Sequence, residues 1–434
     1  MTHGSGTHRT VAVDGLSRIE GEGSLRVEVR DGVVEDVALT IFEPPRFFEA
    51  LLRGRSASEA PDITARICGI CPVAYQMSAC AAVEAAVDVR VDERVTALRR
   101  LLYCGEWIQS HALHVYLLHA PDFLGCADAV ELAERDRGAV QRGLALKRTG
   151  NLVMATVGGR AVHPVNVRVG GFYRAPDPAA VAALAGPLER ARDAALATVD
   201  WVAGFDFPDV EREYRFVALR GDRCYPMESG RVVSSDGLDV TAAGFADRVV
   251  EEHVARSTAL HARIDGRLEY LTGPLARYAL NVDQLPEVAR RAAAAAGLGP
   301  RCTNPFRSIV VRAVELVAAC DEALRLVGGY EPPDPPAAPV GWHAGTGTGA
   351  TEAPRGLLLH RYELDDDGMI RSARIVPPTS QNQLTIESDL RRVAQGGLEL
   401  PDDQLTWRCE QAVRNHDPCI SCAAHFLDVT VARS

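Results

Sequence analysis

The chain has 434 residues, a length that suits a large core divided into two or three lobes. Its 58 acidic and 47 basic side chains give a formal net charge of −11, and no lysine- or arginine-rich run occurs, so we expect no nucleic acid partner. Residues 1–15 lack the regions of a secretory signal, and no stretch reaches roughly 18 unbroken apolar residues, so we expect a cytoplasmic protein without a membrane span.

The first predicted element is a β-hairpin. Residues 10–42 alternate apolar and polar side chains around the turn signal Asp31-Gly32. From about residue 60 to 135 the apolar spacing changes to three or four residues, which predicts helices. The stretch 91–120 keeps this spacing for several turns, so we expect one long helix there, central to the core.

The second half of the chain mixes helices, loops and short strands. We expect a mainly helical α+β fold, with a central bundle of long helices, an N-terminal β region and small peripheral β elements. The predicted division is an N-terminal β region at 1–60, a helical core with loop-rich insertions at 61–330, and a C-terminal β and helical segment at 331–434. The remaining predicted elements are helices near 178–205, 287–299 and 307–327, a proline-rich linker at 330–342, two strands within 356–376 and an amphipathic helix near 402–415.

Two Cys-x-x-Cys pairs stand out among the eleven cysteines. The first is Cys68 and Cys71, and the second is Cys419 and Cys422, which begins 348 positions after Cys71. In a reducing compartment, spaced pairs favour metal binding or catalysis over disulfides. Thiolates three residues apart at a helix end can both reach one ion, so the two pairs together can supply four sulfur ligands.

Three other interpretations of these cysteines stay open at this point. A structural zinc site is one, although the pairs of such sites are usually separated by roughly 15 to 20 residues. A four-cysteine iron–sulfur cluster and two chance pairs of unligated thiols are the others. We interpret the remaining cysteines as small buried hydrophobic residues: Cys80, Cys104, Cys126, Cys224, Cys302, Cys320 and Cys409.

The two cysteine motifs, RICGIC and DPCISCAAH, resemble the signature motifs of the large subunit of nickel-iron hydrogenases. Further motifs similar to those of the family occur in the same order along nearly the whole chain. The resemblance implies the hydrogenase large-subunit fold and a catalytic subunit that reversibly cleaves H2 into protons and electrons. The further motifs are RIEG (18–21), RFFEALLRGR (46–55), GEWIQSHALHVYLLHAPDF (105–123), GGRAVHP (158–164), EAPRGLLLH (352–360) and VPPTSQN (376–382).

The resemblance assigns the metal ligands and the proton acceptors. It implies that Cys68, Cys71, Cys419 and Cys422 bind nickel, and that Cys71 and Cys422 also bridge to an iron that carries CO and cyanide ligands. Soft thiolates suit such a centre. Cys419 is then expected to accept the first proton and Glu20 of RIEG to carry it onward. Without the resemblance, a glutamate in an alternating segment would be interpreted as solvent-exposed.

Five further residues are expected around the metals on the same grounds. The resemblance implies that Arg355 holds a cyanide nitrogen and offsets the thiolate charge. Asp122 and Asp417 are expected to orient this arginine. Thr379 and the backbone around Pro378 are expected to hold the second cyanide. Taken alone, these residues would be interpreted as a surface arginine, two helix caps and a polar loop.

A magnesium site near the C-terminus is also implied. Glu49, His425 and the carbonyl of Ile375 match the ligands of that site in the family, and magnesium prefers oxygen ligands. Residues 426–434 resemble a maturation tail, which a dedicated endopeptidase would remove after nickel insertion. We interpret His111 and His114, by contrast, as core residues that form hydrogen bonds.

Two features resemble the cytoplasmic, NAD(P)-coupled and sulfhydrogenase-like branch of the family. Tyr75 stands where many members carry a histidine, four residues after Cys71, and the chain around GGFYRAP (170–176) has no long insertions. The glycine-rich stretch 345–354 is a weak nucleotide signal, because it lacks the strand-to-helix setting.

The chain needs partners for electron transfer. Beyond the two pairs it has no cluster-binding cysteine run, so a small subunit with iron–sulfur clusters and flavin-containing NAD(P) reductase subunits are implied, together with nickel-insertion chaperones. The alternatives are an H2-sensing regulatory subunit and a non-catalytic scaffold.

Overall fold

The N-terminal residues form an antiparallel sheet. In the computed structural model, which describes residues 8–221 and 223–424, β1 (His8–Val13), β2 (Gly23–Arg30) and β3 (Val33–Ile41) pair in the order β1-β2-β3. Asp31 and Gly32 adopt positive φ angles of 50° and 77°, as an Asp-Gly hairpin turn requires. The predicted hairpin is confirmed, and β1 adds a strand to it.

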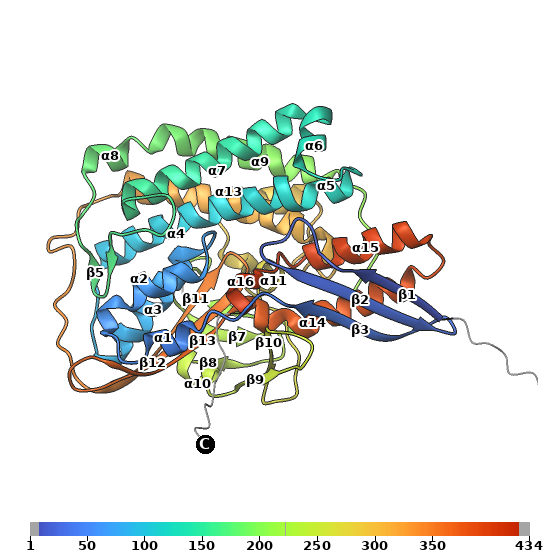
Figure 1. Ribbon diagram of the computed structural model, residues 1–434. Coiled ribbons are helices and arrows are strands. Elements are labelled where there is room, and N and C mark those ends of the chain that lie inside the picture. Colours follow the sequence, from blue (N-terminus) through green and yellow to red (C-terminus); the bar gives the residue numbers. More distant parts are fainter. Residues whose placement is uncertain (1–7, 222, 425–434) are drawn as a thin grey trace, which may run out of the picture.

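Most of the remaining described chain is helical (Figure 1). The helices are α1 (Phe48–Leu52), α2 (Ala60–Thr64), α3 (Pro72–Ala86), α4 (Glu93–Leu113), α5 (Ala120–Phe123), α6 (Ala129–Arg135), α7 (Arg137–Gly158), α8 (Pro178–Ala182), α9 (Ala185–Ala203), α10 (Ala242–Ala246), α11 (Pro274–Asn281), α12 (Glu287–Ala295), α13 (Ser308–Gly328), α14 (Pro378–Gly396), α15 (Asp402–Arg414) and α16 (Ile420–Ala423).

The other strands form small antiparallel sheets. In the described ranges β4 pairs with β5, β6 with β7 and β7 with β8, β9 with β10, and β12 with both β11 and β13. Their bounds are β4 (Val167–Arg168), β5 (Gly171–Phe172), β6 (Val217–Arg220), β7 (Arg231–Ser234), β8 (Asp239–Val240), β9 (Val249–His253), β10 (Leu260–Ile264), β11 (Gly345–Ala353), β12 (Gly356–Leu364) and β13 (Ile370–Val376).

The long helices pack against one another as a bundle, in which α7 contacts α4 and α9, and α13 also contacts α4 and α9. Figure 1 shows α4, α7, α9 and α13 above the sheets. The Asp92 side chain caps the first turn of α4 by accepting from the Arg94 N–H. Beyond Leu113 the helix continues through a π-helical turn, His114–His119, into α5. The predicted long helix and helical bundle are confirmed, and the π turn is a feature that periodicity did not predict.

The glycine-rich stretch at 345–354 is a strand that packs directly on a helix. β11 lies against α3, and a Cβ at Gly347 would lie 2.0 Å from the carbonyl oxygen of Ala82. Only glycine permits so close an approach of two backbones. The motif therefore serves helix–strand packing in this structure.

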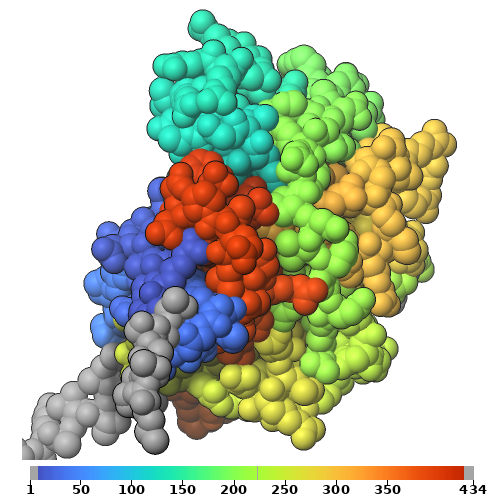
Figure 2. All heavy atoms as spheres, turned by 90° about the vertical axis from the view of Figure 1, so that its right-hand side faces the viewer, coloured from blue at the N-terminus to red at the C-terminus, as the bar shows by residue number. Residues whose placement is uncertain are grey.

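The main core joins residues from all three predicted segments. Its buried side chains include Phe48, Trp107, Leu358 and the cysteines of both pairs. A second core joins the sheet β1–β3 to α14 and α15, and Figure 2 shows the C-terminal segment (red) beside this N-terminal sheet (blue). The boundaries near residues 60 and 330 stay a prediction. No helix in the described ranges is both long and apolar enough to cross a membrane.

Candidate metal centre

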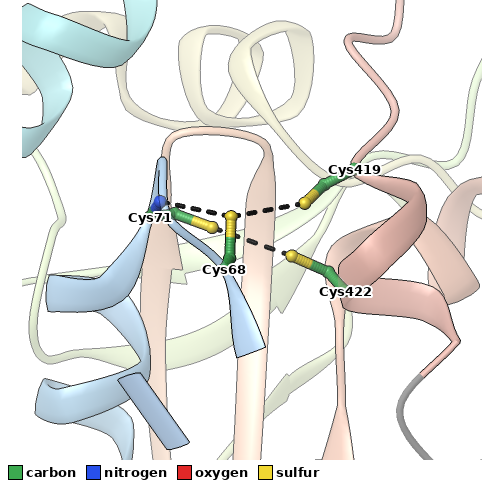
Figure 3. A group of neighbouring side chains, drawn as sticks. All are labelled: Cys68, Cys71, Cys419 and Cys422. Carbon is green, nitrogen blue, oxygen red and sulfur yellow. Dashed lines mark hydrogen bonds between the residues drawn. The ribbon is translucent and has the colours of Figure 1, made fainter. Parts of the chain in front are cut away.

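The two cysteine pairs meet at one buried point (Figure 3). Cys71 immediately precedes α3, and Cys419 immediately precedes α16, in which Cys422 lies. The sulfurs of Cys68 and Cys419 are 3.6 Å apart and those of Cys71 and Cys422 are 3.8 Å apart. All four sulfurs lie within 4.8 Å of one another, and none of the four residues is more than 2% exposed. The predicted convergence across 348 positions is confirmed.

These distances suit a single ion held by four sulfurs. A metal–sulfur distance of about 2.3 Å in tetrahedral geometry places the sulfurs about 3.8 Å apart. Hydrogen bonds from the sulfurs of Cys419, Cys422 and Cys71 hold the pKa of Cys68 well below its usual value. The backbone N–H groups of Ile70 and Cys71 also point at the Cys68 sulfur, at 3.3 and 3.4 Å. Cys68 is therefore readily a thiolate, the form that binds metals.

A buried glutamate fixes the start of the helix that follows the first pair. Glu106 on α4 is fully buried, and its carboxylate accepts from the N–H groups of Val73 at 2.6 Å and Ala74 at 3.1 Å. Pro72 occupies the first position of α3, where the absence of an N–H costs nothing. Glu106 thus satisfies the free donors of the helix end that immediately follows Cys71.

The second pair is held from the N-terminal segment. The Glu20 carbonyl oxygen accepts from the Ile420 N–H at 3.0 Å, and its carboxylate accepts from the Ser421 N–H at 3.0 Å. The Cys419 thiol donates to the same carboxylate at 3.2 Å. Burial, and then the charge of Cys68, raise the pKa of Glu20. The structure thus places Glu20, partly buried, beside Cys419 as expected.

Arg355 and Asp417 form a buried ion pair next to the cysteines. The Arg355 Nε donates to the Asp417 carbonyl oxygen at 2.9 Å, and Nη2 donates to its carboxylate at 3.2 Å. Burial lowers the pKa of Arg355, but Asp417 and the nearby cysteines Cys419, Cys71 and Cys68 raise it more, so the side chain stays charged. Its Nη1 is buried without a hydrogen-bond partner among the described residues. A free, charged donor is thus available at the site.

Asp122 does not contribute to this pair, and the prediction that it orients Arg355 is wrong. One carboxylate oxygen accepts from Arg18 at 2.5 Å and the other accepts from Arg414 at 3.0 Å. In the described part of the chain the side-chain bonds of Arg355 go to Asp417. Asp122 is therefore the partner of two other arginines.

Glu49 contacts Ile375, and Thr379 lies at the cysteine site. The Thr379 hydroxyl oxygen accepts from the Cys419 N–H at 2.9 Å, in the first turn of α14, which begins at Pro378. The Glu49 carboxylate accepts from the Ile375 N–H at 2.6 Å, and burial raises the pKa of Glu49 to about 7. The structure brings Glu49 and Ile375 together, and His425 lies outside the described residues.

The other aromatic and histidine side chains near the site are buried. Burial, and then the charge of Cys422, raise the pKa of Tyr75, which is fully buried. The Nε2 atom of His111 lies 3.0 Å from a Glu315 carboxylate oxygen, and that of His114 lies 2.8 Å from the Arg414 carbonyl oxygen. His114 thus forms a core hydrogen bond, as interpreted from the sequence, whereas the His111 ring contacts the Glu315 carboxylate.

Sequence reasoning did not single out four residues that frame the site. They are Glu43, Arg46, Glu106 and Ser421. All four lie inside or beside segments with recognisable motifs, but their contacts join parts of the chain far apart in sequence. The one local signal was Glu106 itself, a charged residue within the apolar stretch of a long helix.

Comparisons with known proteins agree with this geometry. The model of the family described as "Nickel-dependent hydrogenase" matches residues 46–142. The chain is similar to "Sulfhydrogenase 1 subunit alpha" of Pyrococcus furiosus, with 32% identity over 422 residues that cover 96% of this chain and 98% of the relative. The chain belongs to the nickel-dependent hydrogenase family.

Solved structures support the fold of this hydrogenase chain. A NAD+-reducing [NiFe]-hydrogenase in the H2-reduced state has a TM-score of 0.86 and 27% identity, covering 97% of this chain and 100% of that one. A Ni-Fe-Se hydrogenase from D. vulgaris Hildenborough has a TM-score of 0.78 and 23% identity, covering 96% and 100%, and shows the fold alone. The predicted hydrogenase large-subunit fold is confirmed.

The family also gives the class of reaction. The chain is the catalytic large subunit of a nickel-iron hydrogenase and thus an oxidoreductase that acts on H2. The sensor and scaffold alternatives are not favoured by these findings. Family and four-cysteine cluster together indicate a nickel–iron centre.

Proposed function

We propose that Cys68, Cys71, Cys419 and Cys422 hold nickel, and that Cys71 and Cys422 also bridge to an iron with CO and cyanide ligands. When bound, such a centre supplies the place where H2 is split into two protons and two electrons. The observation that carries the proposal is the meeting of four buried sulfurs within 4.8 Å of one another. A structural zinc ion would explain why the four sulfurs meet. It would not explain why the Glu20 carboxylate and the Arg355 guanidinium lie beside them.

Glu20 receives the proton that leaves the site. As a thiolate, the Cys419 sulfur takes up the first proton, and the resulting thiol passes it to the Glu20 carboxylate, whose oxygen lies 3.2 Å from the sulfur. Burial raises the pKa of Glu20, which makes the carboxylate a better acceptor than an exposed glutamate. Glu20 is therefore positioned for the next transfer.

Arg355 and Thr379 hold the cyanide ligands. The free Nη1 of Arg355 is a buried donor that a cyanide nitrogen would satisfy, and Asp417 fixes the orientation of the guanidinium. The Thr379 hydroxyl accepts from the Cys419 N–H and keeps its own proton to donate to the second cyanide, beside the backbone of Pro378.

Magnesium is bound by Glu49, the carbonyl of Ile375 and His425. The proximity of Glu49 to Ile375 supports this site. A dedicated endopeptidase removes residues 426–434 after nickel-insertion chaperones have loaded the chain. The new C-terminus at His425 then completes the magnesium site.

The electrons leave through a small subunit with iron–sulfur clusters to a flavin-containing NAD(P) reductase module. The likeness to a NAD+-reducing hydrogenase, at 27% identity, supports this carrier, and the name "subunit alpha" of the relative supports an assembly of several chains. Because all cysteines of the described chain are free thiols, the cytoplasm is the proposed compartment.

H2-dependent reduction of NAD+, NADP+ and a viologen dye by the purified complex tests this function. We expect dye reduction together with reduction of at least one nicotinamide. Dye reduction without nicotinamide reduction would refute the NAD(P) link. A complex that contains nickel and reduces neither would refute the catalytic assignment.

A further inference from the structure

Ser421, which lies between the cysteines of the second pair, is bound at three points by charged residues of the N-terminal segment. Its N–H donates to Glu20 at 3.0 Å and its hydroxyl donates to Glu43 at 2.9 Å. Its carbonyl oxygen accepts from the Arg46 Nη2 at 2.5 Å. The polar groups of this one serine are thus satisfied by Glu20, Glu43 and Arg46, more than 370 positions away.

Arg46 also contacts the residue that precedes the first pair. The same Nη2 atom donates to the carbonyl oxygen of Ile67 at 2.6 Å, and the Arg46 backbone N–H donates to the Ala424 carbonyl oxygen at 3.0 Å. Ile67 immediately precedes Cys68, and Ser421 immediately precedes Cys422. One guanidinium nitrogen therefore bridges two carbonyls that are each one peptide away from a proposed metal ligand.

Glu43 lies in a tight space next to Glu20. A Cβ on Gly21 would lie 2.4 Å from the Ile420 Cβ and 2.6 Å from a Glu43 carboxylate oxygen. Gly21 has a φ of +88°, which residues other than glycine rarely adopt. The Glu20–Gly21 backbone, the Glu43 carboxylate and α16 are therefore packed without spare room.

We propose that Arg46 and Glu43 are positioning residues that hold the second cysteine pair against the first through Ser421, and so retain the metal. Joining two motifs across 348 residues costs loop-closure entropy, and gathering four thiolates adds repulsion. Hydrogen bonds from a charged donor to two carbonyls offset part of that cost. The proposal rests on the proposed nickel site for its role in retaining nickel.

Arg46→Met keeps the aliphatic stem of the side chain and removes its donors. We expect this variant of the complex to lose nickel to a chelator such as EDTA at least about tenfold faster than wild type, the factor expected from losing one charged hydrogen bond. Ser421→Ala, which loses only the hydroxyl, should show a smaller acceleration. Glu43→Ala, which removes the acceptor of the same hydroxyl, should show an acceleration similar to that of Ser421→Ala, and nickel release equal to wild type would refute the role of Glu43. The matched control is Arg55→Met, because Arg55 is exposed on the same segment.

A second measurement uses the full chain produced without nickel. We expect iodoacetamide to label Cys422 faster in Arg46→Met than in wild type, with unchanged labelling of Cys409, which is fully buried on α15. Mass spectrometry of the peptides quantifies both sites. This readout does not depend on a bound metal, so a wild-type chain that never binds nickel would refute the nickel site and still leave the positioning role testable.

Two results would overturn the proposal. Nickel release and Cys422 labelling in Arg46→Met equal to those of Arg55→Met would show that the arginine has no positioning role. A parallel rise in the labelling of Cys409 would show general loss of folding, and the specific role of Arg46 would be refuted.

Discussion

Glu106 offers a sharp test of how the fold places the first cysteine pair. In Glu106→Ala the N–H groups of Val73 and Ala74 lose their acceptor in a fully buried position. In Glu106→Gln one of the two bonds persists through the amide oxygen. The other N–H then faces an amide donor.

The magnitude follows from the number of unpaired donors. A buried N–H without a partner costs about 1–3 kcal/mol, so we expect a loss of about 4 kcal/mol for alanine and about 2 kcal/mol for glutamine. The entropy of unfolding of 434 residues is about 0.9 kcal/mol/K, from about 2.1 cal/mol/K per residue. The shift in Tm is the lost free energy divided by this entropy. The expected decrease in Tm is therefore about 4 °C for alanine and about 2 °C for glutamine.

Scanning calorimetry measures these shifts, and nickel content measured on the same samples tests the link to the site. Nickel per chain should fall in Glu106→Ala, because the start of α3 is no longer fixed after Cys71. Glu93→Ala on the same helix is the matched control, since Glu93 is exposed and should change Tm by less than about 1 °C. An unchanged Tm and nickel content in Glu106→Ala would refute the reasoning.

Three further predictions concern the proton path, pH and processing. Glu20→Gln should nearly abolish H2 turnover at unchanged nickel content, and full turnover would exclude Glu20 as a carrier. Burial, and then Arg256 and Arg263, lower the pKa of His261 from 6.5 to about 4. Above pH 6.5 the histidine is neutral in both the folded and the unfolded chain. As the pH falls from 6.5 towards 4, the unfolded chain binds a proton there and the folded chain does not, so the fold loses stability. Between pH 7 and pH 5 the free energy of unfolding should therefore drop by about 2 kcal/mol more in wild type than in His261→Gln. Urea titration at the two pH values measures both drops, and equal drops would refute this role of His261. Mass spectrometry of active protein should show a C-terminus at His425, and full activity with residues 426–434 attached would refute processing.

Local patterns predicted the secondary structure well. The alternation around Asp31-Gly32 located β2 and β3, and the apolar spacing of 91–120 located α4. The strand β1 was missed as a separate element because its alternation merges with that of the hairpin. The π-helical turn at His114–His119 was missed because the helical spacing of apolar residues continues through it.

Only those parts of the site that lie within recognisable motifs could be predicted from the sequence. The cysteine spacing and the family resemblance located all four sulfurs, whereas the partner of Asp122 depends on packing between α5 and α15 that no local pattern encodes. Arg46 and Ser421 are 375 positions apart, and only the folded chain reveals their contact. The role of Glu106 could not be predicted from the sequence either, because its hydrogen-bond partners lie on another helix.

The binding of a nickel–iron centre by Cys68, Cys71, Cys419 and Cys422 can be measured directly. Elemental analysis of the purified complex, with infrared spectra of the same sample, tests it most directly. We expect one nickel for each copy of this chain and infrared bands of CO and cyanide bound to iron. One zinc for each copy of the chain, without nickel and without those bands, would contradict it.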